Sequence, residues 1–141
     1  VSLLYLADAN ILSERHRPRP NPGVVAAMQR HEHEIAMGAP VWHEMLFGAR
    51  RLPPSRRRAR LEQYLEGVRR NFPILPYDTS AAEWHAAERA RLTALGRTPP
   101  FVDGQIASIA YTNDLTLVTA NVADFAQFRG LRVEDWRSAE T

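Results

Sequence analysis

The sequence has 141 residues and a formal charge of +2, with 45% hydrophobic and 24% charged residues. These values are typical of one globular domain and exclude disordered, collagenous and coiled-coil chains. No run of about 18 apolar residues could span a bilayer, and no signal-peptide pattern opens the chain. We therefore expect a cytoplasmic protein that has no membrane partner.

Two absent residue types narrow the chemistry further. The sequence contains no Cys, which excludes thiol nucleophiles, disulfides and cysteine-based metal sites. All eighteen basic residues are Arg, so Walker-type phosphate loops, Schiff bases and kinase-type lysines are excluded as well. The side chains left for chemistry are carboxylates, hydroxyls, His and Arg.

Short apolar segments alternate along the chain with longer stretches of helical periodicity. In chain order, we expect strands at residues 3–7, 35–37, 72–75, 115–118 and 131–133. Between them we expect helices at 11–16, 22–28, 41–52, 56–70, 80–95, 101–112 and 121–128, with Thr79 as the cap of the fifth. This alternation predicts an α/β fold with a doubly wound parallel sheet.

Acidic residues occur where such a sheet binds its ligands. Asp8 directly follows the first predicted strand, and Asp124 lies a few residues beyond the fourth. Glu44 and Asp103 fall in the first turns of two predicted helices. Ligands of open parallel sheets bind beyond the carboxyl ends of the strands, where the strand order reverses. If the first and fourth strands are neighbours, these four carboxylates converge.

Converging carboxylates repel one another, and a divalent cation would relieve that repulsion. Mg²⁺ and Mn²⁺ prefer oxygen ligands and keep several waters, one of which can be activated for attack on a phosphoryl group. Asn10, Thr119 and Asn121 are placed at the same edge of the sheet, where their polar side chains can orient the carboxylates.

Each acid also has a structural explanation when it is taken alone. Asp8 can cap a helix, and Asp103 can favour a helix N-terminus through the helix dipole. Glu44 and Asp124 can be ordinary exposed acids. The histidines at 31 and 33 are better explained as a solvated turn than as metal ligands. Only the joint placement of the four acids predicts a metal site.

Four motifs of this chain, in this order and at these separations, resemble the PIN domain. They are Asp8-Ala9-Asn10, Trp42-His43-Glu44, Phe101-Val102-Asp103, and Val118-Thr119-Ala120-Asn121 followed by Asp124-Phe125. The resemblance covers nearly the whole chain and is closest to the VapC and FitB-like toxins of bacterial toxin–antitoxin pairs.

The resemblance implies a single Rossmann-like PIN domain over residues 1–141, with a parallel five-stranded sheet of order 3-2-1-4-5 flanked by helices. It implies an endoribonuclease that depends on Mg²⁺ or Mn²⁺, a homodimer, and a small antitoxin as partner. Many members carry Asp where this chain has Asn121. The fourth acidic role therefore goes to Asp124, beside Asp8, Glu44 and Asp103.

Arg residues gather between residues 50 and 60. Arg favours phosphate contacts, so Arg50, Arg51, Arg56 and Arg57 are candidates for binding the RNA backbone. Solubility, dimer contacts and pairing with an acidic antitoxin segment are alternative roles for the cluster. For the whole protein, the alternatives are a catalytically silent PIN-fold module that binds nucleic acid or regulates, and a phosphomonoesterase. The absence of Lys and the Asp-x-Asn start argue against the phosphomonoesterase.

Overall fold

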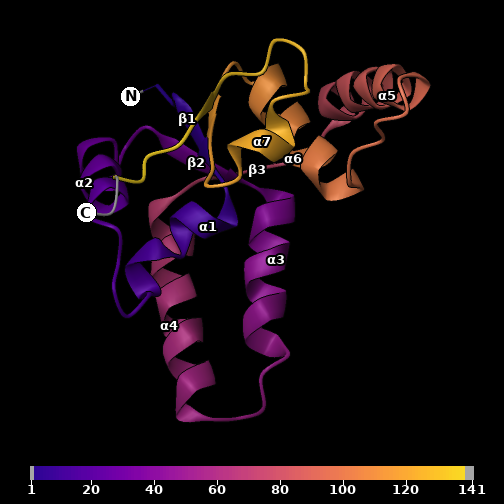
Figure 1. Ribbon diagram of the computed structural model, residues 1–141. Helices are drawn as coiled ribbons and strands as arrows, with labels where there is room; N and C mark the ends of the chain where they lie inside the picture. Colours follow the sequence, from indigo (N-terminus) through magenta and orange to yellow (C-terminus); the bar gives the residue numbers. More distant parts are fainter. Residues whose placement is uncertain (1, 139–141) are drawn as a thin grey trace.

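In the computed structural model, which describes residues 2–138, five strands form one parallel sheet (Figure 1). They are β1 (Tyr5–Ala7), β2 (Ile35–Gly38), β3 (Ile74–Leu75), β4 (Thr116–Val118) and β5 (Val133–Glu134). The spatial order is β3-β2-β1-β4-β5, and every neighbouring pair is parallel. The predicted α/β class and the order 3-2-1-4-5 are confirmed.

The neighbouring strands β1 and β4 lie inside the sheet, and their last two residues are buried. Tyr5 pairs with Thr116, and Leu6 pairs with Leu117. Leu6 and Leu117 are both fully buried, as expected for a parallel sheet covered on both faces. Because β2 and β5 lie on opposite sides of this pair, the strand order reverses between β1 and β4. Residues that directly follow these two strands are therefore neighbours.

Helices cover the sheet. The bounds are α1 (Ala9–Leu12), the 3₁₀ turn η1 (Glu14–His16), α2 (Pro22–Arg30), α3 (Ala39–Arg50), α4 (Arg56–Asn71), α5 (Thr79–Ala94), α6 (Phe101–Thr112) and α7 (Val122–Phe125). Of these, α1, α2, α4 and α5 begin at a capping side chain. The Asn21 and Ser55 side chains accept backbone N–H groups at the starts of α2 and α4. The prediction that Thr79 caps α5 was wrong, because the Asp78 side chain accepts the N–H of Ala81.

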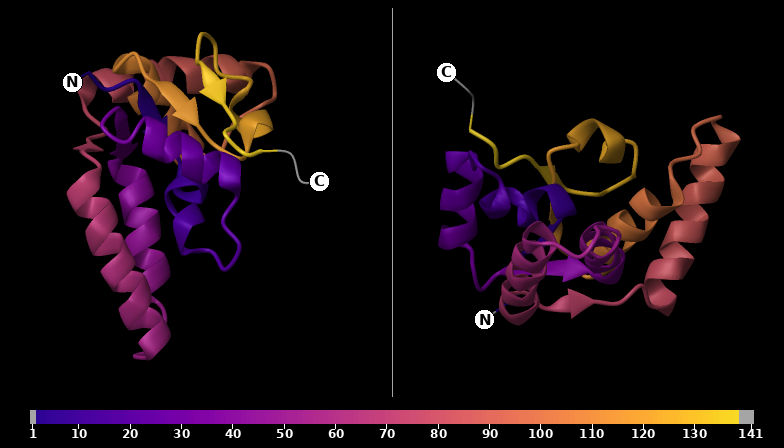
Figure 2. Two further views of the ribbon diagram at one scale, coloured as in Figure 1. Left: turned by 90° about the vertical axis from the view of Figure 1, so that its left-hand side faces the viewer. Right: turned by 90° about the horizontal axis from the view of Figure 1, so that it is seen from below.

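The helices divide the molecule into three regions. Helices α3 and α4 pack against each other as an arm that extends from the sheet (Figures 1 and 2). Helix α2 and the last described residues, up to Ser138, lie together at one end of the sheet (Figure 1). Helices α5 and α6 pack together at the opposite end. No helix within residues 2–138 is both long and apolar enough to cross a membrane.

Helix α3 begins two residues earlier than predicted, and several other differences from prediction lie in short elements. The first predicted helix is split at Ser13 into α1 and η1. Helix α7 ends at Phe125 instead of residue 128, and β5 starts two residues later than expected. Elements this short have little periodicity of their own, so the surrounding packing determines where they end.

Candidate functional site

A pocket of about 570 Å³ opens at the carboxyl edge of β1 and β4. The four acids singled out from the sequence all line it: Asp8, Glu44, Asp103 and Asp124. Asn10 and Asn121 line it too, with walls from His43, Phe47, Val102, Ile106 and Phe125. Of the described residues that line this acid pocket, none is Arg. The pocket is thus rich in carboxylates and has no permanent positive charge in its wall.

Asp8 is the most tightly held of the four acids. It is 7% exposed and directly follows β1. The Thr119 hydroxyl donates to Asp8 Oδ2 at 2.8 Å, and the Ala9 N–H donates to Oδ1 at 2.8 Å. Burial raises the pKa of Asp8, and these two hydrogen bonds work in the opposite direction. Asp8 therefore caps α1 and presents a carboxylate at a fixed position.

Glu44 and Asp103 enter the acid pocket from helices and are held less firmly. Glu44 lies in the second turn of α3, not the first, because that helix already begins at Ala39. Asp103 lies in the first turn of α6, as expected. In contrast to Asp8, neither side chain makes a hydrogen bond or ion pair with another residue of the described chain. Both can therefore change rotamer without breaking a polar contact.

The like charges of the acid pocket influence one another. Burial raises the pKa of Asp103, and the charges of Asp124, Asp8 and Glu44 raise it further. Burial and the Asp8 charge raise the pKa of Glu44, while His43 acts in the opposite direction. A cation in the pocket would remove this mutual repulsion.

The donor set therefore fits a hard divalent cation, although the side chains are spread apart. Among residues 2–138, no group of three or more His, Asp or Glu side chains is arranged so that it could hold one ion as placed. Mg²⁺ keeps several waters when it binds to proteins, so carboxylates that are too far apart to coordinate together can still contact its hydration shell.

The three polar residues expected to orient the carboxylates have different contacts. Thr119 alone bonds to a carboxylate, that of Asp8. Asn10 accepts the N–H of Ala120 at 3.1 Å and lies 3.5 Å from the Thr119 hydroxyl. The Asn121 N–H donates to the Thr119 hydroxyl at 3.0 Å. Asn10 and Asn121 thus fix the loop after β4 and act on the carboxylates only through Thr119.

Asp124 and Asn121 both line the acid pocket, from the short helix α7 and the residue before it. The Asp124 charge raises the pKa of both Asp8 and Asp103, which places its carboxylate within electrostatic reach of them. Asn121 carries no charge to add to this cluster. The assignment of Asp124 as the fourth acid stays a prediction.

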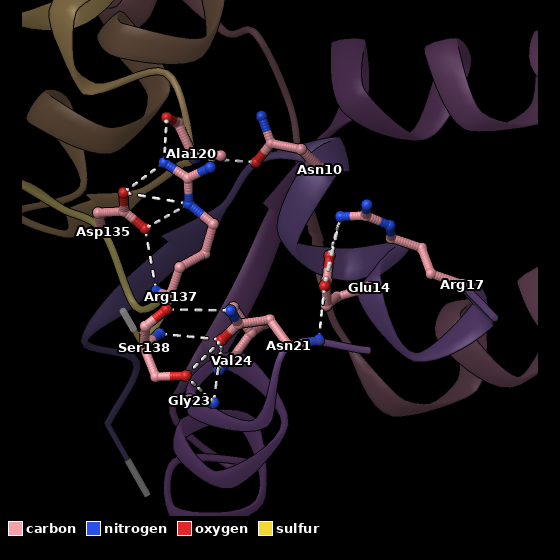
Figure 3. Close-up of polar contacts among 10 residues, drawn as sticks. All are labelled: Asn10, Glu14, Arg17, Asn21, Gly23, Val24, Ala120, Asp135, Arg137 and Ser138. Carbon is pink, nitrogen blue, oxygen red and sulfur yellow. Dashed lines mark hydrogen bonds and ion pairs between the residues drawn. The ribbon is translucent and has the colours of Figure 1, made fainter. Parts of the chain in front are cut away.

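Residues 135–138, the C-terminal segment, also contact the loop after β4 (Figure 3). The sequence analysis did not predict this contact. The Arg137 guanidinium donates to the Ala120 carbonyl at 3.2 Å and to Asp135 at 2.8 Å. The Ala120 peptide is therefore held through its N–H by Asn10 and through its carbonyl by Arg137 (Figure 3). No local sequence signal marks the two contacts to Ala120, because they join it to residues 17 and 110 positions away.

Asn21 anchors the C-terminal segment to α2 (Figure 3). Its Oδ1 accepts the Ser138 N–H at 2.9 Å, and its Nδ2 donates to the Ser138 carbonyl at 3.2 Å. A Cβ at Gly23 would lie 2.5 Å from the Ser138 nitrogen, so only glycine permits this approach. The buried Glu14 accepts the Asn21 N–H at 2.7 Å, which fixes the anchor in place.

A second cavity, the arm groove, lies along α1, α3 and α4 and measures about 580 Å³. It shares Ala9, Glu44 and Phe47 with the acid pocket, so the two are continuous. Arg51 and Arg57 line the arm groove. Arg50 and Arg56 are exposed on the same arm but are not among its lining residues. The structure thus divides the four predicted RNA-binding arginines into two pairs.

Comparison with known proteins gives a consistent result. The family model described as "PIN domain" matches residues 5–131. The chain is 28% identical over 135 residues to the tRNA(fMet)-specific endonuclease VapC of Shigella flexneri, covering 95% of this chain and 98% of that protein. It is 30% identical over 126 residues to toxin FitB of Neisseria gonorrhoeae, covering 86% and 91%. A solved structure of FitAB bound to a DNA fragment contains a chain that superposes with a TM-score of 0.88, at 27% identity, over 98% of this chain and 99% of that one.

Proposed function

The chain belongs to the PIN domain family, and we propose that it is a metal-dependent endoribonuclease that acts as the toxin of a toxin–antitoxin pair. The observation that carries this proposal is the convergence of four carboxylates in one pocket that has no Arg in its wall. The names of the VapC and FitB relatives support the nuclease and toxin roles.

In the proposed reaction, water attacks an RNA phosphodiester in line with the leaving oxygen. Asp8, Glu44, Asp103 and Asp124 would hold one or more Mg²⁺ or Mn²⁺ ions, directly or through water. The metal would supply positive charge for the phosphoryl oxygens and an acidified water. Asp8 provides the fixed carboxylate because Thr119 and the Ala9 N–H hold both of its oxygens. Glu44 and Asp103 are free to reorient when the charge of the site changes.

Cleavage of total RNA by purified, partner-free protein tests this proposal. We expect discrete fragments with Mn²⁺ or Mg²⁺ and none with EDTA. Asp103→Asn should keep its fold, judged by circular dichroism, and should lose most of the cleavage. Full activity of Asp103→Asn, or cleavage that persists in EDTA, would contradict the proposal.

The same proposal includes two partners, a small antitoxin and a second copy of this chain. The solved FitAB and VapBC assemblies, whose toxin-like chains resemble this one, support an antitoxin. Exposed apolar side chains near the C-terminal ends of α5 and α6, those of Leu95 and Tyr111, support a homodimer. Co-expression with the neighbouring small gene, followed by light scattering after size exclusion, should give a stable complex with two copies of this chain. A monomer with no co-purifying protein would contradict both assignments.

A catalytically silent module that binds nucleic acid is the second candidate. The observation in its favour is that the acids of the described chain are not grouped tightly enough to hold an ion as placed. Melting curves distinguish the candidates, because an ion that binds the folded protein raises its melting temperature. We expect millimolar Mg²⁺ or Mn²⁺ to stabilise metal-free protein. No shift, together with no cleavage, would favour the silent module.

A further inference from the structure

Three flat side chains follow one another along the exposed face of α3. His43, Phe47 and Arg51 are four residues apart and so share one side of the helix. The His43 and Phe47 rings are 6.3 Å apart between centroids and 14° from parallel. The Arg51 Cζ lies 5.9 Å from the Phe47 centroid, over the ring. We call these three side chains the α3 ladder.

The α3 ladder connects the two cavities. His43 lines the acid pocket, Arg51 lines the arm groove, and Phe47 lines both. The Phe47 side chain is 57% exposed. A Phe ring that stays in water does not contribute the favourable free energy of burial to folding. An exposed aromatic ring at the junction of the acid pocket and an arm groove that combines apolar lining with Arg51 and Arg57 is therefore a candidate binding surface.

The charges on the two sides of Phe47 favour an RNA strand as its occupant. Carboxylates dominate one side, where a cation would have to accompany any phosphate. Arg51 and Arg57 on the other side attract phosphates directly. A strand with its scissile phosphate at the acids and its neighbouring phosphates at these arginines would bring a base to the Phe47 ring.

We propose that the α3 ladder binds unpaired nucleobases of the RNA substrate, with Phe47 as the stacking surface and Arg51 and Arg57 as phosphate contacts beside it. The inference rests on the proposed ribonuclease function and assigns its substrate contacts to named side chains. Every base has a flat face that stacks on an aromatic ring, whereas paired bases in a helix do not expose that face. The α3 ladder therefore contacts a segment whose bases are unpaired.

Binding measured in EDTA tests the ladder without cleavage. The probes are short fluorescein-labelled single-stranded RNAs, intact or with one abasic nucleotide placed at successive positions, and the readout is fluorescence anisotropy. For the wild-type protein, we expect one or two abasic positions to weaken binding about tenfold, since stacking of one base on an aromatic ring contributes an effect of that order. A duplex of the same sequence should bind more weakly than the single strand.

Variants of Phe47 identify the stacking residue. Phe47→Leu keeps an apolar side chain but has no flat ring. This variant should therefore bind intact and abasic RNAs with the same affinity. Phe47→Tyr should retain the full abasic effect. The matched control is Phe101→Leu, because Phe101 is 49% exposed with the Arg89 Cζ 5.4 Å from its centroid, yet it does not line either cavity. Phe101→Leu should leave the abasic effect unchanged.

The arginines provide a second matched comparison. Arg51→Gln and Arg57→Gln should each weaken the binding of intact and abasic RNA by the same factor. Each should also lower the slope of log affinity against log salt concentration by about one. Arg50→Gln and Arg56→Gln, which remove the same charge outside the arm groove, should have smaller effects. Equal effects of all four substitutions would show that the cluster acts only through its total charge, which would overturn the phosphate contacts.

The outcomes separate this inference from the proposed function. If Phe47→Leu retains the abasic effect while the wild-type protein cleaves RNA with Mg²⁺, base binding by the α3 ladder is contradicted and the ribonuclease proposal is supported. If the abasic effect depends on Phe47 but no RNA is cleaved, base binding by the α3 ladder is supported. The catalytically silent binding module is then favoured over the ribonuclease. Absence of RNA binding, or a Phe47→Leu defect seen only in antitoxin binding, would overturn the ladder.

Discussion

Two corners of the acid pocket hold their carboxylates in different ways. In the fixed corner, Asp8 is buried at the end of β1, and Thr119 and Ala9 donate hydrogen bonds to its two oxygens. In the open corner, Glu44 and Asp103 project from helices without polar contacts to the described chain. The fixed corner can define where an ion sits. The open corner can adjust to the ion and to the substrate.

Substitutions that change the length of an acidic side chain should give the largest difference in cleavage rate between the two corners. Asp8→Glu moves a buried carboxylate by about one bond and should lower the cleavage rate about 100-fold, because such a displacement disrupts a pre-organised site. Glu44→Asp should lower it about tenfold or less, since this side chain has room to reorient. Single-turnover cleavage of one RNA by both variants measures the difference. Equal losses would show that the two corners are equally rigid.

Thr119 should account for much of the rigidity of the fixed corner. Thr119→Val keeps the shape of the side chain but removes the donor to Asp8, so metal affinity and activity should fall about 10- to 100-fold. Thr119→Ser restores the hydroxyl and should recover most of the loss. Calorimetric titration with Mn²⁺ gives the affinities. If Thr119→Val binds Mn²⁺ like the wild-type protein, Thr119 has only a packing role.

Burial of the acids and, to a smaller extent, repulsion among them should make the metal-free protein less stable at neutral pH. The pKa values of Asp8, Glu44 and Asp103 are raised above their ordinary values of 3.8 and 4.5. The folded protein therefore retains protons that the unfolded chain loses, and its stability falls as the pH rises through these raised pKa values. Melting temperatures in EDTA should decrease over that range. The decrease should be smaller in Asp103→Asn, and Mg²⁺ should oppose it.

A contradictory result of this pH series would be a melting temperature that rises through the same range in EDTA. That result would mean that the carboxylates are stabilised as anions in the folded protein. The open corner would then contain a positive charge that offsets the charges of Glu44 and Asp103.

Arg137 should have the smallest effect, because it acts on the fixed corner through the Ala120 carbonyl. Its ion pair with Asp135 is exposed, so Arg137→Ala should cost at most about 1 kcal/mol in unfolding free energy. Activity should fall a few-fold, with Mn²⁺ affinity falling in parallel. Arg132→Ala is the matched control, since Arg132 pairs with Asp114 on the surface. Identical activities of the two variants would remove Arg137 from the site.

Sequence reasoning predicted most of the framework. The helix at residues 101–112 agrees with the structure, and so does the strand order that the resemblance to the PIN domain implied. The four acids were identified by their places after strands or near helix starts, and the structure brings them to one pocket. The helix and the acids depend on local periodicity and on strand ends, which a sequence displays directly.

The contacts around the loop after β4 could not be predicted. Asn10 was expected to orient carboxylates, but its side chain accepts the N–H of Ala120, 110 residues away. Asn21 caps α2, yet its side chain also binds Ser138, 117 residues away. An Asn side chain has the same donors and acceptors in every such role, so only the folded chain determines which partner it meets.

The sequence by itself determined the α/β class, the types of side chain available for chemistry and the four acids, because these depend on composition and on short-range pattern. The tertiary structure alone decided that Asp8 is held while Glu44 and Asp103 are not, and that Phe47 joins the acid pocket to the arm groove. Burial and hydrogen bonding depend on which distant segments approach one another. That approach is set by packing of the whole chain, which no local pattern encodes.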